Sequence, residues 1–141
     1  MRLYTYFRSS SSYRVRLVLA IKKIPYESEP VHLLRDGGQQ RDAAYVEHNP
    51  MAQVPALVFD LYGKTQVLTQ SVAIAEYLEE RFPSPPLLPA DALARAKTRS
   101  LVEIINSGIQ PLQNLSLLNH LKGLSSDAHA FARRANETGL A

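Results

Sequence analysis

Four short segments of the sequence contain side chains that could bind an anion or a peptide. They are Arg8 with the serines 9–12, the tripeptide 53–55 (Gln-Val-Pro), the pair 70–71 (Gln-Ser) and the polar stretch 110–114. Hydroxyl groups and free backbone N–H groups at a helix N-terminus stabilise negative charge, because the helix dipole and the unpaired donors both favour it. One serine is enough to cap a helix, so four serines beside an arginine indicate an anion site, with capping alone as the alternative.

The other three segments each have a plain structural explanation as well. Pro55 could begin an edge strand, or could follow a cis peptide bond that turns the backbone of Val54 toward an extended peptide ligand. Ser71 could cap a helix, or hold a carboxylate together with the N–H groups that follow it. Gln110 and Asn114 lie four residues apart, so we expect them on one helical face, exposed to solvent or lining a cleft.

Alternating strand and helix patterns must position the first three segments. The strands are predicted at 3–7, 25–31, 54–59 and 66–68, the helices at 13–23, 42–46 and 71–82, and a loop at 33–40. The order β-α-β-α-β-β-α implies one parallel pair and a closing antiparallel hairpin. The sequence therefore predicts an α/β, thioredoxin-like domain with a mixed four-stranded sheet.

A proline-rich stretch divides the chain. Four of the nine prolines lie between Pro83 and Pro89, and proline cannot donate a hydrogen bond to a helix or a central strand. We therefore expect an extended linker over 83–90 between a first domain, 1–82, and a second domain, 91–141.

The second domain has a helical pattern. Apolar residues repeat at helical spacing over 92–121, and Gly108 and Pro111 predict a kink there. A weakly amphipathic stretch follows over 125–140. Two helices alone cannot enclose much core.

Composition excludes several kinds of chemistry. The chain has no cysteine, which excludes disulfides, Cys-based zinc sites, a Cys nucleophile and Cys-x-x-Cys redox chemistry. The four histidines lack metal-ligand spacing, so no metal is expected. The net charge of +3 is spread along the chain, which argues against a nucleic-acid partner.

No apolar run approaches the ~20 residues that span a bilayer, and no secretory signal is seen. We expect a cytoplasmic protein without a membrane partner.

Five motifs together point to one enzyme family. They are residues 6–16 (YFRSSSSYRVR), 36–40 (DGGQQ), 49–57 (NPMAQVPAL), 70–74 (QSVAI) and 108–115 (GIQPLQNL). Over residues 1–120 the chain closely resembles the zeta class of glutathione transferases, whose best-known members are maleylacetoacetate isomerases; bacterial maleylpyruvate isomerases are similar. The resemblance implies a thioredoxin-like domain followed by part of the family's all-α C-terminal domain, and a homodimer in the intact family form.

The resemblance also implies a glutathione site, residue by residue. Ser9 matches the hydroxyl that favours the glutathione thiolate, and Ser10 and Ser11 match its neighbours in the Ser-Ser-Cys motif, with serine in place of the cysteine. Arg8 is the expected anchor of a substrate carboxylate. The remaining matches are Gln40 near the glycyl end, Val54 and cis-Pro55 at the cysteinyl backbone, Gln70 and Ser71 at the γ-glutamyl end, and Gln110, Asn114, Leu115 and Ser116 from the helical part.

For the family, the implied reaction is glutathione-dependent cis–trans isomerisation of a small unsaturated keto acid, with glutathione transferase activity beside it. The substrate would be maleylacetoacetate, in tyrosine and phenylalanine degradation, or maleylpyruvate. Because the family's helical domain is longer than the stretch after the linker, the alternative is a glutathione-binding fragment with little or no turnover. A thiol–disulfide oxidoreductase on the same fold would need a cysteine, so that class is excluded.

Overall fold

The computed structural model describes residues 1–124 and 127–140, which form two compact units, Met1–Leu87 and Leu88–Ala141. The boundary lies within the proline-rich stretch 83–90. Residues 125 and 126, at the start of the expected final helical stretch, and residue 141 lie outside the described residues.

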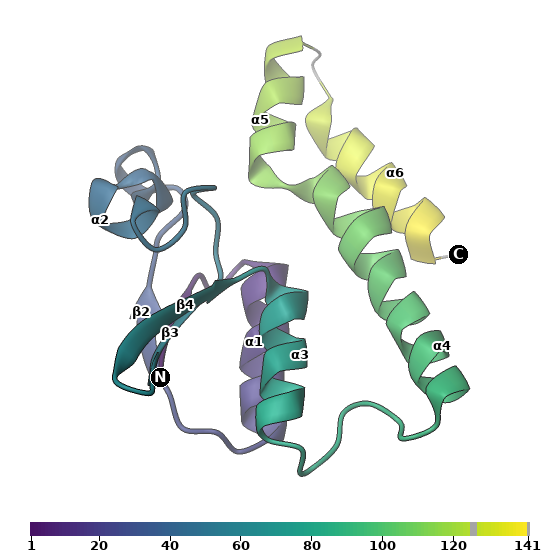
Figure 1. Ribbon diagram of the computed structural model, residues 1–141. Coiled ribbons are helices and arrows are strands. Elements are labelled where there is room, and N and C mark those ends of the chain that lie inside the picture. Colours follow the sequence, from purple (N-terminus) through teal and green to yellow (C-terminus); the bar gives the residue numbers. More distant parts are fainter. Residues whose placement is uncertain (125–126, 141) are drawn as a thin grey trace. The chain divides into compact units, whose positions relative to one another are not determined.

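A mixed four-stranded sheet forms the centre of the first unit (Figure 1). Its strands are β1 (Arg2–Thr5), β2 (Glu27–Pro30), β3 (Ala56–Leu61) and β4 (Lys64–Thr69), in the order β2-β1-β3-β4. β1 and β2 are parallel, whereas β3 is antiparallel to both β1 and β4. The predicted thioredoxin-like sheet with one parallel pair and a closing hairpin is confirmed.

Three helices complete this unit: α1 (Ser10–Ile21), α2 (Ala43–Val46) and α3 (Ser71–Arg81). The long connection through α1 allows β1 and β2 to run parallel, because parallel strands need a crossover. The β3–β4 hairpin turns at Tyr62 and Gly63, which both have positive φ, the backbone conformation that suits the twist of a two-residue hairpin.

Helices α1 and α3 lie side by side on one face of the sheet (Figure 1). The residues between them and the sheet are apolar and almost solvent-free: Leu3, Val15, Leu19, Leu57, Ile74 and Leu78. Alternate strand residues point to opposite faces, so a second cluster forms on the other face, containing Tyr6, Val31, Tyr45, Val54 and Ala56. Burial of each large apolar side chain contributes roughly 1.5–3 kcal/mol, and the two clusters hold the strand ends in place.

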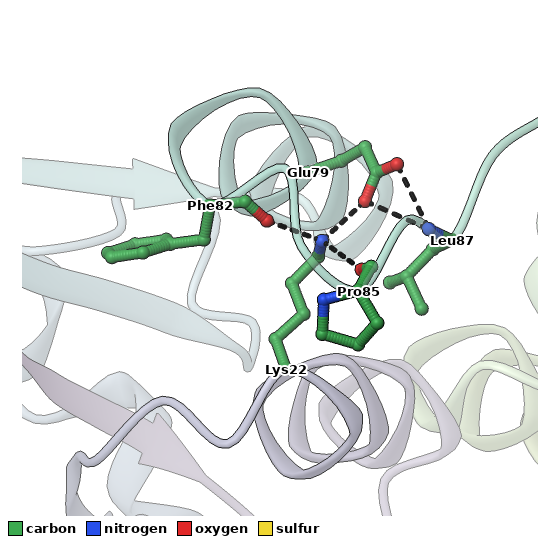
Figure 2. Close-up of polar contacts among 5 residues, drawn as sticks. All are labelled: Lys22, Glu79, Phe82, Pro85 and Leu87. Carbon is green, nitrogen blue, oxygen red and sulfur yellow. Dashed lines mark hydrogen bonds and ion pairs between the residues drawn. The ribbon is translucent and has the colours of Figure 1, made fainter. Parts of the chain in front are cut away.

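A buried ion pair ties the proline-rich stretch to the first unit (Figure 2). The Lys22 side chain, at the end of α1, is fully buried, and its Nζ lies 2.5 Å from Glu79 Oε2. The same ammonium group donates to the carbonyls of Phe82 at 2.6 Å and Pro85 at 3.0 Å. Glu79 also accepts the Leu87 N–H at 3.0 Å. The stretch has no helix or strand, yet it is fastened to α1 and α3 rather than free.

The second unit is helical. It contains α4 (Ala92–Glu103), α5 (Leu115–Leu124) and α6 (Ala128–Leu140). Between α4 and α5 the chain passes through a π-helical stretch, Ile104–Ile109, and a 3-10 turn, Gln110–Gln113. Gly108 and Pro111 both lie in this irregular part, so the predicted kink is confirmed.

The core of the second unit is small. α6 packs back onto the π-helical stretch, where Gly139 leaves no room for a β-carbon beside Ile109. Ile109 and Ala128 are the buried apolar residues in the described part of this unit. Across both described ranges, no helix combines the length and the apolar character needed to cross a membrane.

Candidate functional site

The strand ends bring the first three candidate segments to one edge of the sheet. Thr5 ends β1 beside Pro30, which ends β2. Ala56, at the start of β3, pairs with Tyr4 of β1 and with Thr69 at the end of β4. The segments that leave or enter the sheet at this edge are 6–11, 31–40, 52–55 and 70–71. Residues far apart in the sequence are therefore gathered by the strand register alone.

Ser9 is the N-cap of α1. Its Oγ accepts the backbone N–H of Ser12 at 3.1 Å, and its own backbone is extended. This cap lets the helix begin at Ser10, three residues before the predicted start at Tyr13. A hydroxyl group has two acceptor positions and one proton, so the cap leaves the Ser9 proton available to an anion. The capping and anion-binding interpretations are therefore compatible.

The other members of the expected catalytic set surround this cap. Arg8 is exposed, Ser10 is the exposed first residue of the helix, and Ser11 is half-buried. The N–H groups of Ser10 and Ser11 belong to the first helical turn, so they have no acceptor within the helix. An anion above the helix end would meet both hydroxyl and backbone donors.

Arg16 shapes the turn that leads to Ser9. Its Nη1 donates to Thr5 Oγ1 at 2.7 Å and to the Tyr6 carbonyl at 3.2 Å, and its Nη2 donates to the Phe7 carbonyl at 3.3 Å. The Ser9 N–H also donates to the Tyr6 carbonyl, at 3.1 Å. Because these carbonyls turn toward α1, the strand ends at Thr5 and not at Phe7 as predicted.

The Val54–Pro55 peptide bond is cis, which the residues alone left open and the family resemblance implied. The preceding carbonyl, of Gln53, accepts two hydrogen bonds, from the Tyr45 hydroxyl at 2.6 Å and from Asn49 Nδ2 at 2.7 Å. Within residues 1–124 and 127–140 no hydrogen bond is found for the backbone N–H or C=O of Val54. An anchored loop thus presents an unpaired stretch of backbone beside the start of β3.

The Tyr45 hydroxyl, which holds the Gln53 carbonyl, should make the stability of the protein depend on pH in alkaline solution. Burial raises the pKa of the Tyr45 hydroxyl, and a hydrogen bond with Asn49 offsets part of that rise. An acid whose pKa rises on folding contributes stability below its unfolded pKa, about 10 for tyrosine, and that stability is lost as the pH rises above it.

The unfolding free energy of the wild-type chain is therefore expected to fall above about pH 10, and Tyr45→Phe to reduce that slope. At neutral pH the variant should lose about 1 kcal/mol, because its hydrogen bond to Gln53 is gone. Urea unfolding from about pH 8 to about pH 11 measures both effects. Tyr62→Phe, at an exposed tyrosine, is the control and should keep the wild-type slope. An unchanged slope in Tyr45→Phe would contradict the prediction.

Gln70 and Ser71 form a sharp turn between β4 and α3. Gln70 has a φ of +67°, and its Nε2 lies 3.6 Å from Met51 Sδ. The buried Ser71 Oγ accepts from Arg14 Nη1 at 2.5 Å. The prediction that Ser71 caps this helix is wrong: Gln70 occupies the cap position, and Ser71 is the first helical residue. Its hydroxyl points to α1 because Arg14 binds it there, and its proton remains available to a ligand.

Gln40 lies in the segment that the sequence predicted as a loop. This segment forms two 3-10 turns, Arg35–Gly37 and Gln39–Arg41. The Gln40 side chain is buried, and its Oε1 has no hydrogen-bond partner in the part of the chain that the structure describes. A β-carbon at Gly38 would lie 2.5 Å from Gln40 Nε2, and Gly38 has a φ of +101°, so this close approach requires glycine. A buried amide with an unmet bond costs roughly 1–3 kcal/mol, so this oxygen is suited to a bound water or a polar ligand.

The four expected residues of the helical part lie in the second unit. The prediction that Gln110 and Asn114 share a helical face is wrong, because the backbone leaves the 3-10 turn and becomes extended at Asn114. Asn114 Oδ1 instead accepts from the N–H of Ser116 at 3.1 Å and from its hydroxyl at 3.0 Å. Leu115 is half-buried at the start of α5. A role for these four residues in ligand binding stays a prediction.

Comparison with known proteins identifies the family. The family model described as "Glutathione S-transferase, N-terminal domain" matches residues 8–81, from Arg8 to the end of α3. The chain belongs to the glutathione S-transferase family. The matched range contains every candidate residue of the sheet edge.

Within the glutathione S-transferases, the chain belongs to the zeta-class and maleylacetoacetate isomerase group. It is 50% identical to the maleylacetoacetate isomerase of Pseudomonas aeruginosa over 127 residues. These residues are 90% of this chain and 58% of that protein. A solved maleylpyruvate isomerase, described as a bacterial zeta-class glutathione S-transferase, has a TM-score of 0.88 and 38% identity over 99% of this chain and 65% of its own.

A third relative carries ligands. The maleylacetoacetate isomerase from Anaeromyxobacter dehalogenans 2CP-1, with glutathione in its active site, has a TM-score of 0.88 and 47% identity, over 99% of this chain and 64% of its own. Another structure of that isomerase contains dicarboxyethyl glutathione and citrate. This zeta-class chain therefore spans less than two thirds of the length of each of these three relatives.

The sequence interpretation of this glutathione S-transferase assigned no role to two arginines of α1. Arg14 reaches Ser71 of α3, and Arg16 reaches the turn after β1. Residues two apart on a helix point about 200° apart, so the Arg-x-Arg spacing places them on different sides of α1. That spacing was visible in the sequence, but the acceptors of both side chains were not.

Proposed function

We propose that this chain binds glutathione along the sheet edge, and that the protein to which it belongs uses glutathione to isomerise a small unsaturated keto acid. The observation that carries the proposal is a set of unused polar groups at this one edge. They are the hydroxyl protons of Ser9 and Ser71, the backbone of Val54 and the buried amide of Gln40.

Each group suits one part of a γ-glutamyl-cysteinyl-glycine peptide. The N-terminus of α3, with Ser71 and Gln70, suits the α-carboxylate of the γ-glutamyl end. The Val54 N–H and C=O suit the cysteinyl backbone, which would pair with them as an added strand. Ser9 suits the sulfur and Gln40 the glycyl end.

When bound, glutathione supplies a thiolate that adds reversibly to the substrate double bond, which can then rotate as a single bond before the thiolate leaves. Ser9 would favour the thiolate by donating a hydrogen bond from its hydroxyl group to the sulfur, and the N-terminus of α1 adds a favourable dipole. Arg8, exposed beside this cap, presents a guanidinium suited to a substrate carboxylate. The chain's own residues thus lower the cost of the anion and orient the acid beside it.

Maleylacetoacetate and maleylpyruvate are the proposed substrates, and a homodimer is the proposed assembly of the intact protein. The names of the relatives support the substrate class, and the A. dehalogenans structures, with bound glutathione, dicarboxyethyl glutathione and citrate, support glutathione and a small carboxylic acid. The alternative is a glutathione-binding fragment without turnover. It is favoured by one observation, that the chain spans 58% of the P. aeruginosa isomerase.

Two measurements on the full chain separate these possibilities. Isothermal titration with reduced glutathione tests binding, and the conversion of maleylacetone from cis to trans in the presence of glutathione tests turnover. Binding with turnover is the expected result, whereas binding alone would support the fragment alternative. Ser28→Ala, at an exposed serine in the middle of β2, is a control that should change neither measurement. Absence of both binding and turnover would contradict the proposed function.

A further inference from the structure

Arg14 binds the hydroxyl group of Ser71 from the neighbouring helix. Side chains on a helix lean toward its N-terminus, so Arg14, in the second turn of α1, extends back toward the sheet edge where α3 begins. Its Nη1 lies 2.5 Å from Ser71 Oγ, and Ser71 is only 5% exposed. The bond therefore joins α1 to α3 at the proposed subsite for the γ-glutamyl end.

The chemistry of arginine fixes the direction of this hydrogen bond. A guanidinium group has five N–H donors and no acceptor, and it keeps its charge in proteins. The Ser71 oxygen is therefore the acceptor, and the Ser71 proton cannot be donated to Arg14. No acceptor for that proton is found in the described ranges, 1–124 and 127–140. A side chain with an acceptor oxygen at position 14 could instead take up this proton.

The start of α3 offers further donors beside this hydroxyl. Gln70 occupies the cap position, and its side chain makes no capping hydrogen bond. The N–H groups of the first helical turn have no acceptor within the helix. A carboxylate at this point would meet the Ser71 hydroxyl and backbone N–H groups together. A neutral ligand group would gain less, because hydrogen bonds to a charged acceptor are stronger.

We propose that Arg14 is a positioning residue that makes this subsite selective for a carboxylate, because it keeps the Ser71 hydroxyl as a donor toward the ligand. The inference rests on the proposed function. It names the part of glutathione that Arg14 serves, the α-carboxylate of the γ-glutamyl end. A bond that only fastens α1 to α3 is the alternative, and it predicts no preference for a carboxylate.

The test compares two ligands by isothermal titration of the full chain. They are reduced glutathione and γ-aminobutyryl-cysteinyl-glycine, which is glutathione without its α-carboxylate. In Arg14→Gln the new amide oxygen can accept the Ser71 proton, so the affinity for glutathione should fall at least about tenfold. Its affinity for the shortened ligand should stay within about twofold of wild type, because the lost bond is made to the carboxylate. An equal loss for both ligands would overturn the inference.

Two further arginine variants separate the hydrogen bond from the charge. Arg14→Lys again has only donors at this position and should recover most of the affinity for glutathione. Arg81→Gln, at the exposed end of α3, removes the same charge about 15 Å along the helix from Ser71. It should keep both affinities within about twofold of wild type. A loss in Arg81→Gln as large as that in Arg14→Gln would overturn the inference.

Unfolding in urea tests the hydrogen bond without any ligand. Arg14→Met and Ser71→Ala remove the same bond, so the midpoint of the double variant should fall by less than the sum of the two single falls. Additive falls would overturn the inference. A wild-type chain that binds no glutathione would contradict the proposed function, and the urea midpoints would still decide whether Arg14 holds Ser71.

Discussion

The Ser9→Ala variant is expected to lose at least about a hundredfold of the glutathione-dependent isomerisation rate while remaining folded. Ser9 Oγ caps α1 through the Ser12 N–H, and its proton is free for the sulfur. Loss of the cap costs about 1 kcal/mol of unfolding free energy. Loss of the donor removes a hydrogen bond to a developing anion, which is the larger effect on rate.

The serine run supplies a matched control. Ser12 is fully buried, and its Oγ has no hydrogen-bond partner among the described residues. Ser12→Ala therefore removes an unsatisfied hydroxyl, leaves the backbone N–H that Ser9 accepts, and should keep both rate and stability. A Ser9→Ala chain with an unchanged rate, or an equal loss in Ser12→Ala, would contradict the assignment.

A second measurement, which does not depend on turnover, also tests the assignment of Ser9. The ultraviolet absorbance of bound glutathione reports thiolate formation as the pH rises. Because a donated hydrogen bond favours the charged form, Ser9→Ala should shift thiolate formation to higher pH. Ser9→Thr keeps a hydroxyl at the same position and should restore most of the wild-type titration.

The Lys22→Met variant is expected to lower the free energy of unfolding by about 3–5 kcal/mol. The ammonium group is fully buried and donates to one carboxylate and two carbonyls (Figure 2). Its removal takes the ammonium group away from the mostly buried Glu79 carboxylate and from the carbonyls of Phe82 and Pro85. The loss is large because a mostly buried carboxylate loses this ion-pair partner.

Two further variants make the Lys22 prediction specific. Combining Lys22→Met with Glu79→Gln removes the carboxylate charge as well but keeps an acceptor for the Leu87 N–H, so about 1–2 kcal/mol should return. Lys23→Met, at the exposed neighbouring lysine, should change stability by less than about 0.5 kcal/mol. Denaturant unfolding measures all of these values. A Lys22→Met loss no larger than that of Lys23→Met would contradict the buried ion pair.

Much of the fold was predictable because its signals are local. Strand 54–59, helix 71–82 and the break after Phe82 follow from apolar periodicity and proline content, and the structure has β3, α3 and the irregular stretch close to those places. The errors came at element ends. Gln70 adopts a positive φ that few non-glycine residues take, so the cap of α3 moved one residue from the expected Ser71.

By itself the sequence determined the family motifs, the order of the elements and the proline break, since each depends on residues close together in the chain. The tertiary structure alone decided which distant side chains form hydrogen bonds with these segments. Arg14 reaches Ser71 across 57 positions, and Lys22 reaches Pro85 across 63. No local pattern names a distant acceptor. The acceptor is decided by which strand end or helix end is packed beside the side chain, because a polar group removed from water must find a partner there.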